Sequence, residues 1–165
     1  MFRVNQFHPE QNWRIKTDKK SRDIQVLPCG NKILVSNSKG GTIYSIKDGK
    51  KIKDIITSLR GVESAVFKDK NFYFLGSGND ITVTDCSGKI LNKIIIKEKL
   101  KAYRLMRFDS DNNIMIAAQN VILKVDRKGE EVERINLQGK MYVAKRNSDA
   151  DLLTSFGYKG IVAVL

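Results

Sequence analysis

Short apolar runs separated by small polar turns recur along the whole chain. Between residues 30 and 56, three such runs at 33–35, 42–46 and 52–56 are separated by a polar turn and by an Asp-Gly turn. Apolar runs of this length are typical of strands, and tight Asp-Gly turns are typical of hairpins. No segment longer than about ten residues has helical periodicity. The pattern therefore predicts an all-β fold.

The same order of elements occurs three times and begins a fourth time. The glycines of the last turn in each complete copy, Gly49, Gly88 and Gly129, lie 39 and 41 residues apart. A four-stranded antiparallel unit of about 40 residues is the blade of a β-propeller. We therefore predict a β-propeller of four four-stranded blades. The predicted copies span residues 24–56, 62–96, 103–137 and 141–164.

The two ends of the sequence suggest how such a ring would close. The fourth copy stops after its third strand, and the segment 12–17 (NWRIKT) resembles the missing outer strand. We expect this strand to close the last blade, because a paired strand removes an exposed sheet edge. The expected organisation is a flexible arm at 1–11 and a single propeller domain at 12–165. Two alternatives are a homodimer that exchanges this strand within one larger ring, and truncation from a longer protein.

Three segments carry a family resemblance: GNKILVSNSKGGTIYSIKDGK, NFYFLGSGNDITVTDCSGK and NNIMIAAQNVILKVDRKGE. They resemble the repeats of bacterial quinoprotein-like propellers and are similar to NHL-type repeats, and the resemblance covers roughly residues 12–165. It implies a propeller fold. Quinoprotein dehydrogenase repeats place a Trp after the turn glycine, where this chain has 89–91 and 130–132 (KIL and EEV). No quinone or other cofactor is therefore expected.

Charge and cysteine content narrow the classes of partner and compartment. The chain of 165 residues has 30 Lys and Arg against 18 Asp and Glu, a net charge of +12. Such an excess favours anionic partners, although dispersed lysines are also typical of an ordinary solvated surface. Cys29 and Cys86 have no metal or redox spacing, so free thiols are favoured over a bridge. We find no apolar window of membrane-spanning length and no signal-peptide pattern, which leaves the compartment open.

Catalytic and metal-binding patterns are weak. The single histidine, His8, falls in the predicted arm. The sequence therefore does not favour a catalytic site in which a histidine activates a serine or cysteine nucleophile. Residues 109–113 (DSDNN) resemble the start of a calcium loop but lack its glycine and distal glutamate, and a plain turn is favoured. Among the carboxylates only Glu63 lies where an enzyme would use it. The expectation is a protein without catalysis or a bound metal.

Binding residues are expected where propeller loops share one face. The loops that lead into each inner strand and those that join the second and third strands carry cations, amides and tyrosines. Such groups are suited to phosphate, carboxylate or sulfate, and tyrosines also stack on single-stranded bases. The predicted ligand-binding residues are Arg22, Lys39, Arg60, Asn79, Lys101, Tyr103, Arg104, Asn120, Lys140, Tyr142 and Tyr158.

The favoured function is a non-catalytic binding or scaffolding propeller that recognises a protein or an anionic, glycan-like ligand on this loop face. One alternative is an NHL-like binder of single-stranded nucleic acid, which would show strongly salt-dependent affinity. Another is a propeller-type lyase or hydrolase. The expected state is a monomer or the strand-exchanged homodimer.

Overall fold

The computed structural model describes residues 14, 15, 17, 20–59 and 61–137, together with the strands at 141–146, 152–156 and 161–164. The described residues form fifteen strands and no helix. The first sheet contains β1 (Ile24–Val26), β2 (Lys32–Asn37), β3 (Gly40–Ser45) and β4 (Lys51–Ile56). The second contains β5 (Val62–Lys68), β6 (Asn71–Gly76), β7 (Asp80–Thr84) and β8 (Ile90–Ile95).

The later part of the chain repeats the arrangement. The third sheet contains β9 (Leu105–Phe108), β10 (Ile114–Ala118), β11 (Val121–Val125) and β12 (Glu131–Asn136). The fourth contains β13 (Met141–Arg146), β14 (Leu152–Phe156) and β15 (Ile161–Val164). Each strand pairs antiparallel with the strand that follows it in the same sheet. The prediction of an all-β chain built from repeated four-stranded units is confirmed for the first three copies.

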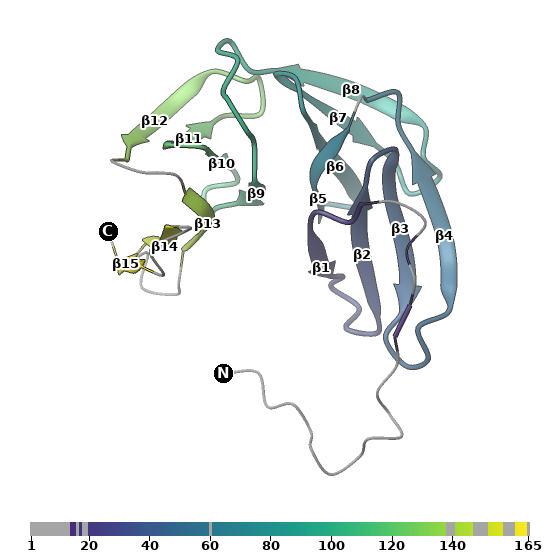
Figure 1. Cartoon of the computed structure of the whole chain (residues 1–165). Helices are drawn as coiled ribbons and strands as arrows, with labels where there is room; N and C mark the ends of the chain where they lie inside the picture. Colours follow the sequence, from purple (N-terminus) through teal and green to yellow (C-terminus); the bar gives the residue numbers. More distant parts are fainter. Residues whose placement is uncertain are drawn as a thin grey trace.

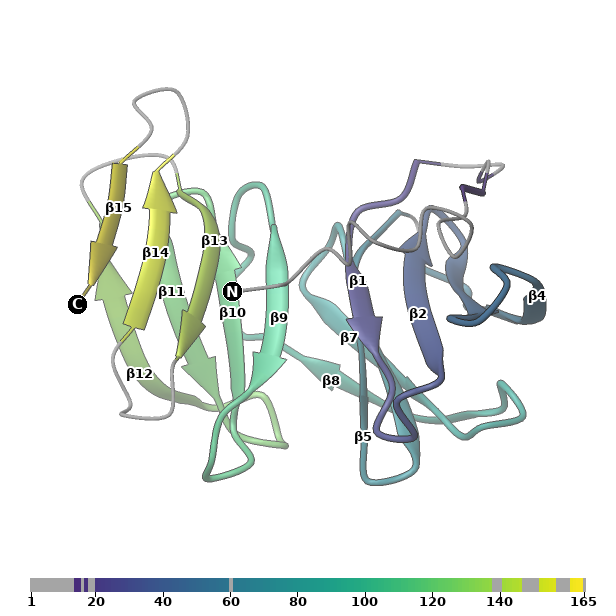
Figure 2. The same cartoon turned by 90° about the horizontal axis from the view of Figure 1, so that it is seen from below.

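The four sheets follow one another along an arc, with the first and fourth at its two ends (Figures 1 and 2). Strands β1, β5 and β9 lie on the inner side of the arc, and β4, β8 and β12 lie on its outer side (Figure 1). The extensive contacts between sheets of the described residues join each sheet to the next, and none joins the fourth sheet to the first. No helix of the described residues is long and apolar enough to cross a membrane.

The segment before β1 contains the predicted closing strand at 12–17, of which residues 14, 15 and 17 are described. Ile15 packs against Ile33, Val35 and Tyr44 of the first sheet, and the described residues of this segment are not in a strand. The fourth sheet contains three strands among the described residues, and the closing strand stays a prediction. Residues 12, 13 and 16 and the predicted arm at 1–11 lie outside the described part of the chain.

Neighbouring sheets pack face to face through apolar side chains. We call the face toward the next sheet in chain order the forward face, and the opposite one the backward face. Leu34, Ile43 and Ile55 on the forward face of the first sheet are buried against the backward face of the second. That backward face includes Phe72 and Phe74. Alternation along each strand produces the two faces, since successive side chains point to opposite sides of a sheet.

Gly41 makes the close contact between the first and second sheets possible. A Cβ atom at this position would lie 2.8 Å from Leu34 Cδ1 and 3.0 Å from Phe74 Cε1. Both neighbours are fully buried in the interface, so neither side chain has free space into which it can move. The absence of a side chain in β3 therefore lets a phenylalanine ring approach the first sheet.

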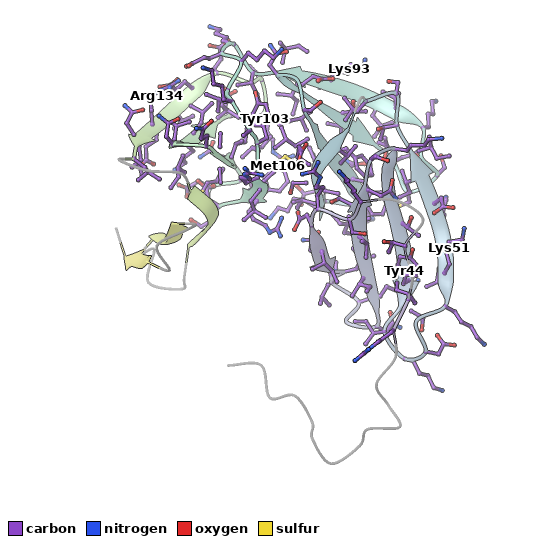
Figure 3. All side chains as sticks on the ribbon, viewed as in Figure 1. Tyr44, Lys51, Lys93, Tyr103, Met106 and Arg134 are labelled. Atoms are coloured by element: carbon purple, nitrogen blue, oxygen red, sulfur yellow. The ribbon has the colours of Figure 1, made fainter. Side chains whose placement is uncertain are left out.

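The second and third sheets meet through the larger of the apolar clusters. The forward face of the second sheet contributes Tyr73, Leu75 and Ile81, and the backward face of the third contributes Met106 and Ile116. Met106 lies where the two sheets meet (Figure 3). The runs of consecutive apolar residues in β6 and β10 thus reflect strands that are covered on both faces.

Candidate functional site

A polar cluster ties the inner strands of the first three sheets together; we call Asp23, Ser64 and Arg107 the inner clip. Arg107 Nη1 donates to Asp23 Oδ2 at 2.7 Å and Nη2 donates to Oδ1 at 2.6 Å. Ser64 Oγ also donates to Asp23 Oδ2 and accepts a hydrogen bond of 3.0 Å from the Met106 N–H. The Asp23 side chain is only 5% exposed, so these charge-assisted bonds replace most of its contact with water.

The inner clip is built for structure rather than for nucleophilic chemistry. A serine nucleophile needs a base that removes its proton, and the carboxylate of Asp23 is held in a bidentate pair with Arg107. Sequence reasoning missed the clip, because its members come from three different repeats and belong to no local motif. No signal in the sequence sets these three residues apart, because each stands near other polar residues such as Arg22, Glu63 and Arg104.

A hollow of about 640 Å³ lies on the loop face between the segment after β8 and the β10–β11 turn. Two backbone hydrogen bonds shape it: the Gln119 N–H donates to Lys101 O at 3.0 Å, and the Leu137 N–H donates to Asn120 O at 2.8 Å. We call it the loop hollow. The residues that line it are Glu98, Lys99, Leu100, Lys101, Gln119, Asn120, Val121, Arg134, Asn136 and Leu137.

Some charged side chains of the loop hollow form ion pairs within the protein, and others are exposed. Arg134, which lies on β12 (Figure 3), donates to Glu131 at 2.7 Å and also pairs with Glu98. The hydrogen bonds with Glu131 and then Glu98 raise the pKa of Arg134, and the same contact lowers the pKa of Glu131. Lys99 and Lys101 are exposed. The two lysines therefore supply the positive charge that is open to a ligand.

Two of the predicted ligand-binding residues, Lys101 and Asn120, line the loop hollow together. Tyr103 does not join them on the surface. Its side chain is 2% exposed, its hydroxyl accepts a 3.1 Å hydrogen bond from the Leu100 N–H, and burial raises its pKa. This corrects the expectation of an exposed aromatic ring, because the apolar contacts between the second and third sheets take the ring into the core. Arg104, the adjacent predicted residue, is partly buried.

The other described candidates, Arg22, Asn79 and Lys39, do not line the loop hollow. Arg22 forms an ion pair of 3.4 Å with Glu63, which also places the one candidate catalytic carboxylate beside a cation. Asn79 Nδ2 donates to Ile96 O at 2.9 Å and so holds two loop segments together. Lys39 borders a separate, smaller hollow of about 100 Å³ on the first sheet.

Four of the predicted residues cannot be placed as side chains. Arg60, Lys140 and Tyr158 lie outside the described residues, and Tyr142 lies in β13, of which only the backbone is described. They stay predictions.

The acidic turn after β9 matches the expectation of a plain turn. Asp109 Oδ1 accepts hydrogen bonds from the N–H groups of Asp111 (2.9 Å) and Asn113 (2.8 Å). Its other oxygen forms an ion pair of 2.9 Å with Lys124. Desolvation opposes ionisation of Asp109, but these hydrogen bonds outweigh it, and the pKa of Asp109 is lowered. Within the described residues, no group of three or more His, Cys, Asp or Glu side chains is arranged to hold a metal ion.

Both cysteines are exposed free thiols. Cys86 Sγ donates to Lys70 O at 3.2 Å, and the chain forms no bridge between Cys29 and Cys86.

No family model and no curated protein sequence matches the chain. Solved structures do match. A protein of unknown function from Bacteroides caccae superposes with a TM-score of 0.72 at 16% identity, over 93% of this chain and 59% of that one. The WD40 β-propeller domain of Doa1 gives 0.69 at 16% identity, over 90% and 51%. Virginiamycin B lyase from Staphylococcus aureus gives 0.68 at 14% identity, over 91% and 56%.

The chain spans about half the length of these three structures, whereas it covers 92% of the computationally designed Ika4 protein, at a TM-score of 0.62 and 14% identity. At these identities the similarity concerns the fold, and the matched proteins include both WD40 domains and lyases. Together with three four-stranded antiparallel sheets arranged along an arc, the comparisons show that this chain has the β-propeller fold.

Proposed function

We propose that this protein is a non-catalytic binding module that takes an anionic, glycan-like ligand in the loop hollow. The observation that carries the proposal is the combination of two exposed lysines and three side-chain amides around one hollow of about 640 Å³. Ammonium groups pair with carboxylate or sulfate, and amides exchange hydrogen bonds with sugar hydroxyl groups. The amides are those of Gln119, Asn120 and Asn136.

The composition of the hollow favours a glycan over single-stranded nucleic acid. Binding of unpaired bases relies on aromatic side chains on which the bases stack. None of the described residues that line the hollow is aromatic, and Tyr103, the nearest candidate in sequence, is in the core. Lysines with amides and no stacking ring therefore favour a ligand with hydroxyl groups and negative charge.

The same residues support a binding role without catalysis. The described lining contains no histidine, cysteine or serine, and its carboxylate, Glu98, pairs with Arg134. A general base must reach the proton that it removes, and a carboxylate already engaged by a guanidinium is poorly suited to that role. The structural neighbours include both WD40 domains and lyases, so this proposal rests on the residues of the hollow and not on the fold.

The test is calorimetric titration with a short heparin oligosaccharide and, separately, with an oligouridylate of similar charge. We expect the double variant Lys99→Glu and Lys101→Glu to bind the oligosaccharide at least tenfold more weakly than the unmodified chain, since both attractive charges become repulsive. The matched control is Lys89→Glu and Lys93→Glu, which makes the same charge change on two exposed lysines. Neither lysine lines the hollow, and Lys93 lies on β8 (Figure 3).

Equal weakening in both double variants would mean that net charge alone drives binding, and would contradict a site in the hollow. Tighter binding of the oligouridylate than of the oligosaccharide would favour the nucleic-acid alternative. Binding of neither probe by the unmodified chain would overturn the proposal.

A further inference from the structure

We propose that the backward face of the first sheet docks the fourth sheet of a second copy of this chain, so that two arcs form one larger ring. The backward face of the first sheet is defined by Ile24, Val26, Ile33, Val35 and Tyr44. It is the surface that, in the second and third sheets, packs against the preceding sheet.

Corresponding positions in the three sheets have very different exposure. In the first sheet, Ile24 of β1 pairs with Val35. The corresponding pairs are Ala65 with Phe74 in the second sheet and Met106 with Ile116 in the third. The side chain of Ile24 is 59% exposed, whereas its counterparts Ala65 and Met106 are 2% and 0% exposed. The repeat therefore places an apolar residue where a preceding sheet would bury it, and here it faces solvent.

A second position of β1 shows the same difference. Val26 pairs with Ile33 as Phe67 pairs with Phe72 and Phe108 with Ile114. Val26 is 55% exposed, whereas Phe67 and Phe108 pack against the apolar clusters between sheets. Ile24 and Val26 therefore form a small exposed apolar patch on β1. The corresponding strands of the second and third sheets, β5 and β9, lie in interfaces between sheets.

The exposed patch lies where sheets meet most closely. At each junction the inner strand of the following sheet makes the contact: β5 against β1 and β2, β9 against β5, and β13 against β9 and β10. By this rule β1 is the strand that a preceding sheet would contact. Ile15 covers the middle of the backward face through Ile33, Val35 and Tyr44, and it leaves the β1 edge exposed.

The fourth sheet carries a matching set of register positions for the occupant. In the fourth sheet, Leu153 pairs with Val164, and Ser155 pairs with Val162. The corresponding pairs of the second sheet are Tyr73 with Val83 and Leu75 with Ile81. In the second sheet these positions form the forward face, which is buried against the third. The forward positions of the fourth sheet thus repeat the mostly apolar pattern of a surface that accepts a backward face.

Two copies satisfy both surfaces at once. Among the described residues, the backward face of the first sheet packs against no other sheet, and no extensive contact joins the fourth sheet to the first. Head-to-tail contacts form a closed ring when the rotation closes. The arc superposes on 51 to 59% of three longer chains and on 92% of one designed chain, so the measured mass decides how many sheets the closed ring contains.

The test is the solution mass of the full chain by light scattering over a range of concentrations at physiological salt. We expect twice the mass of one chain, with dissociation on dilution. The double variant Ile24→Asp and Val26→Asp should weaken the dimer about a hundredfold, since interface centres carry most of the binding energy and buried charges are costly. The matched control is Ile95→Asp and Val132→Asp, two aliphatics that are each 53% exposed on outer strands.

A dimer in the unmodified chain and in the control, together with a folded monomer for the β1 variant, would support the proposal. A monomer at every concentration, as expected if the chain closed its own ring or if residues 1–13 covered the patch, would overturn it. So would a dimer that the β1 variant leaves intact. If the aspartate variant fails to fold by circular dichroism, Ile24→Ser with Val26→Ser replaces it, with the same criteria.

Discussion

The contacts in the middle of the sheets differ in kind from those on the inner side of the arc. In the middle, Phe74 and Met106 are completely buried among apolar side chains. On the inner side, the inner clip of Asp23, Ser64 and Arg107 joins three strands by charge-assisted hydrogen bonds. Apolar burial is non-directional and supplies most of the stabilisation. The hydrogen bonds of the clip, in contrast, form in only one relative position of their donors and acceptors. The comparison suggests that the apolar faces hold the sheets together and that the clip fixes their relative positions.

The largest effect is expected for Phe74→Ala in the apolar region. The change removes a fully buried ring from the junction of the first and second sheets and leaves a cavity that Gly41 cannot fill. We expect a loss of about 3 to 5 kcal/mol in the free energy of unfolding, measured by urea denaturation. Ile95→Ala, at an exposed position, is the control and should change stability by less than about 0.5 kcal/mol. A similar loss in the two variants would contradict the assignment of the interface.

An intermediate effect is expected for Asp23→Ala in the inner clip. The change leaves the Arg107 guanidinium and the Ser64 hydroxyl without their shared acceptor. Because Arg107 keeps about a quarter of its side chain exposed, water compensates in part, and we expect a loss of about 2 kcal/mol. The variant Arg107→Ala and the double variant complete a cycle. Losses that simply add would show that the two residues do not act as a pair.

The smallest effect is expected for Asp109→Asn, which tests a polar pair within one sheet. The lowered pKa of Asp109 means that its ionised form stabilises the fold above the unfolded pKa of about 3.9. That contribution is lost as the pH falls through the still lower folded pKa. We expect the variant to be less stable by about 1 kcal/mol at neutral pH, and the difference to shrink in acid. A difference that is the same at pH 7 and pH 3 would show that ionisation of Asp109 is not involved.

Several features followed from the sequence because they depend on neighbouring residues. The alternation and the turn glycines located the twelve strands of the three complete copies, since side chains alternate between the faces of a strand and tight turns need positive φ. Gly49, Gly88 and Gly129 all have it, at 68°, 96° and 89°. The turn at Asp109 and the free cysteines were also predictable from local chemistry.

The candidate site was predictable only in part. Lys101 and Asn120 were identified from their loops and do share a hollow. Arg134 was missed because it lies on an outer strand, and its neighbour in the hollow, Glu98, is 36 residues away in sequence. Tyr103 looked like an exposed ring, but a position beside a strand does not show whether an adjacent sheet will cover it.

The sequence by itself determined the repeat, the strands and the all-β class, because these depend on residues that lie within one hairpin of each other. The tertiary structure alone decided which residues meet across sheets: the inner clip, the buried Tyr103 and the packing of Ile15 on the first sheet. The reason is physical. Contacts between sheets join residues that are distant in the sequence, such as Lys53 and Cys86 or Asp23 and Ser64, which are 33 and 41 positions apart, and only the packing of whole sheets brings such residues together.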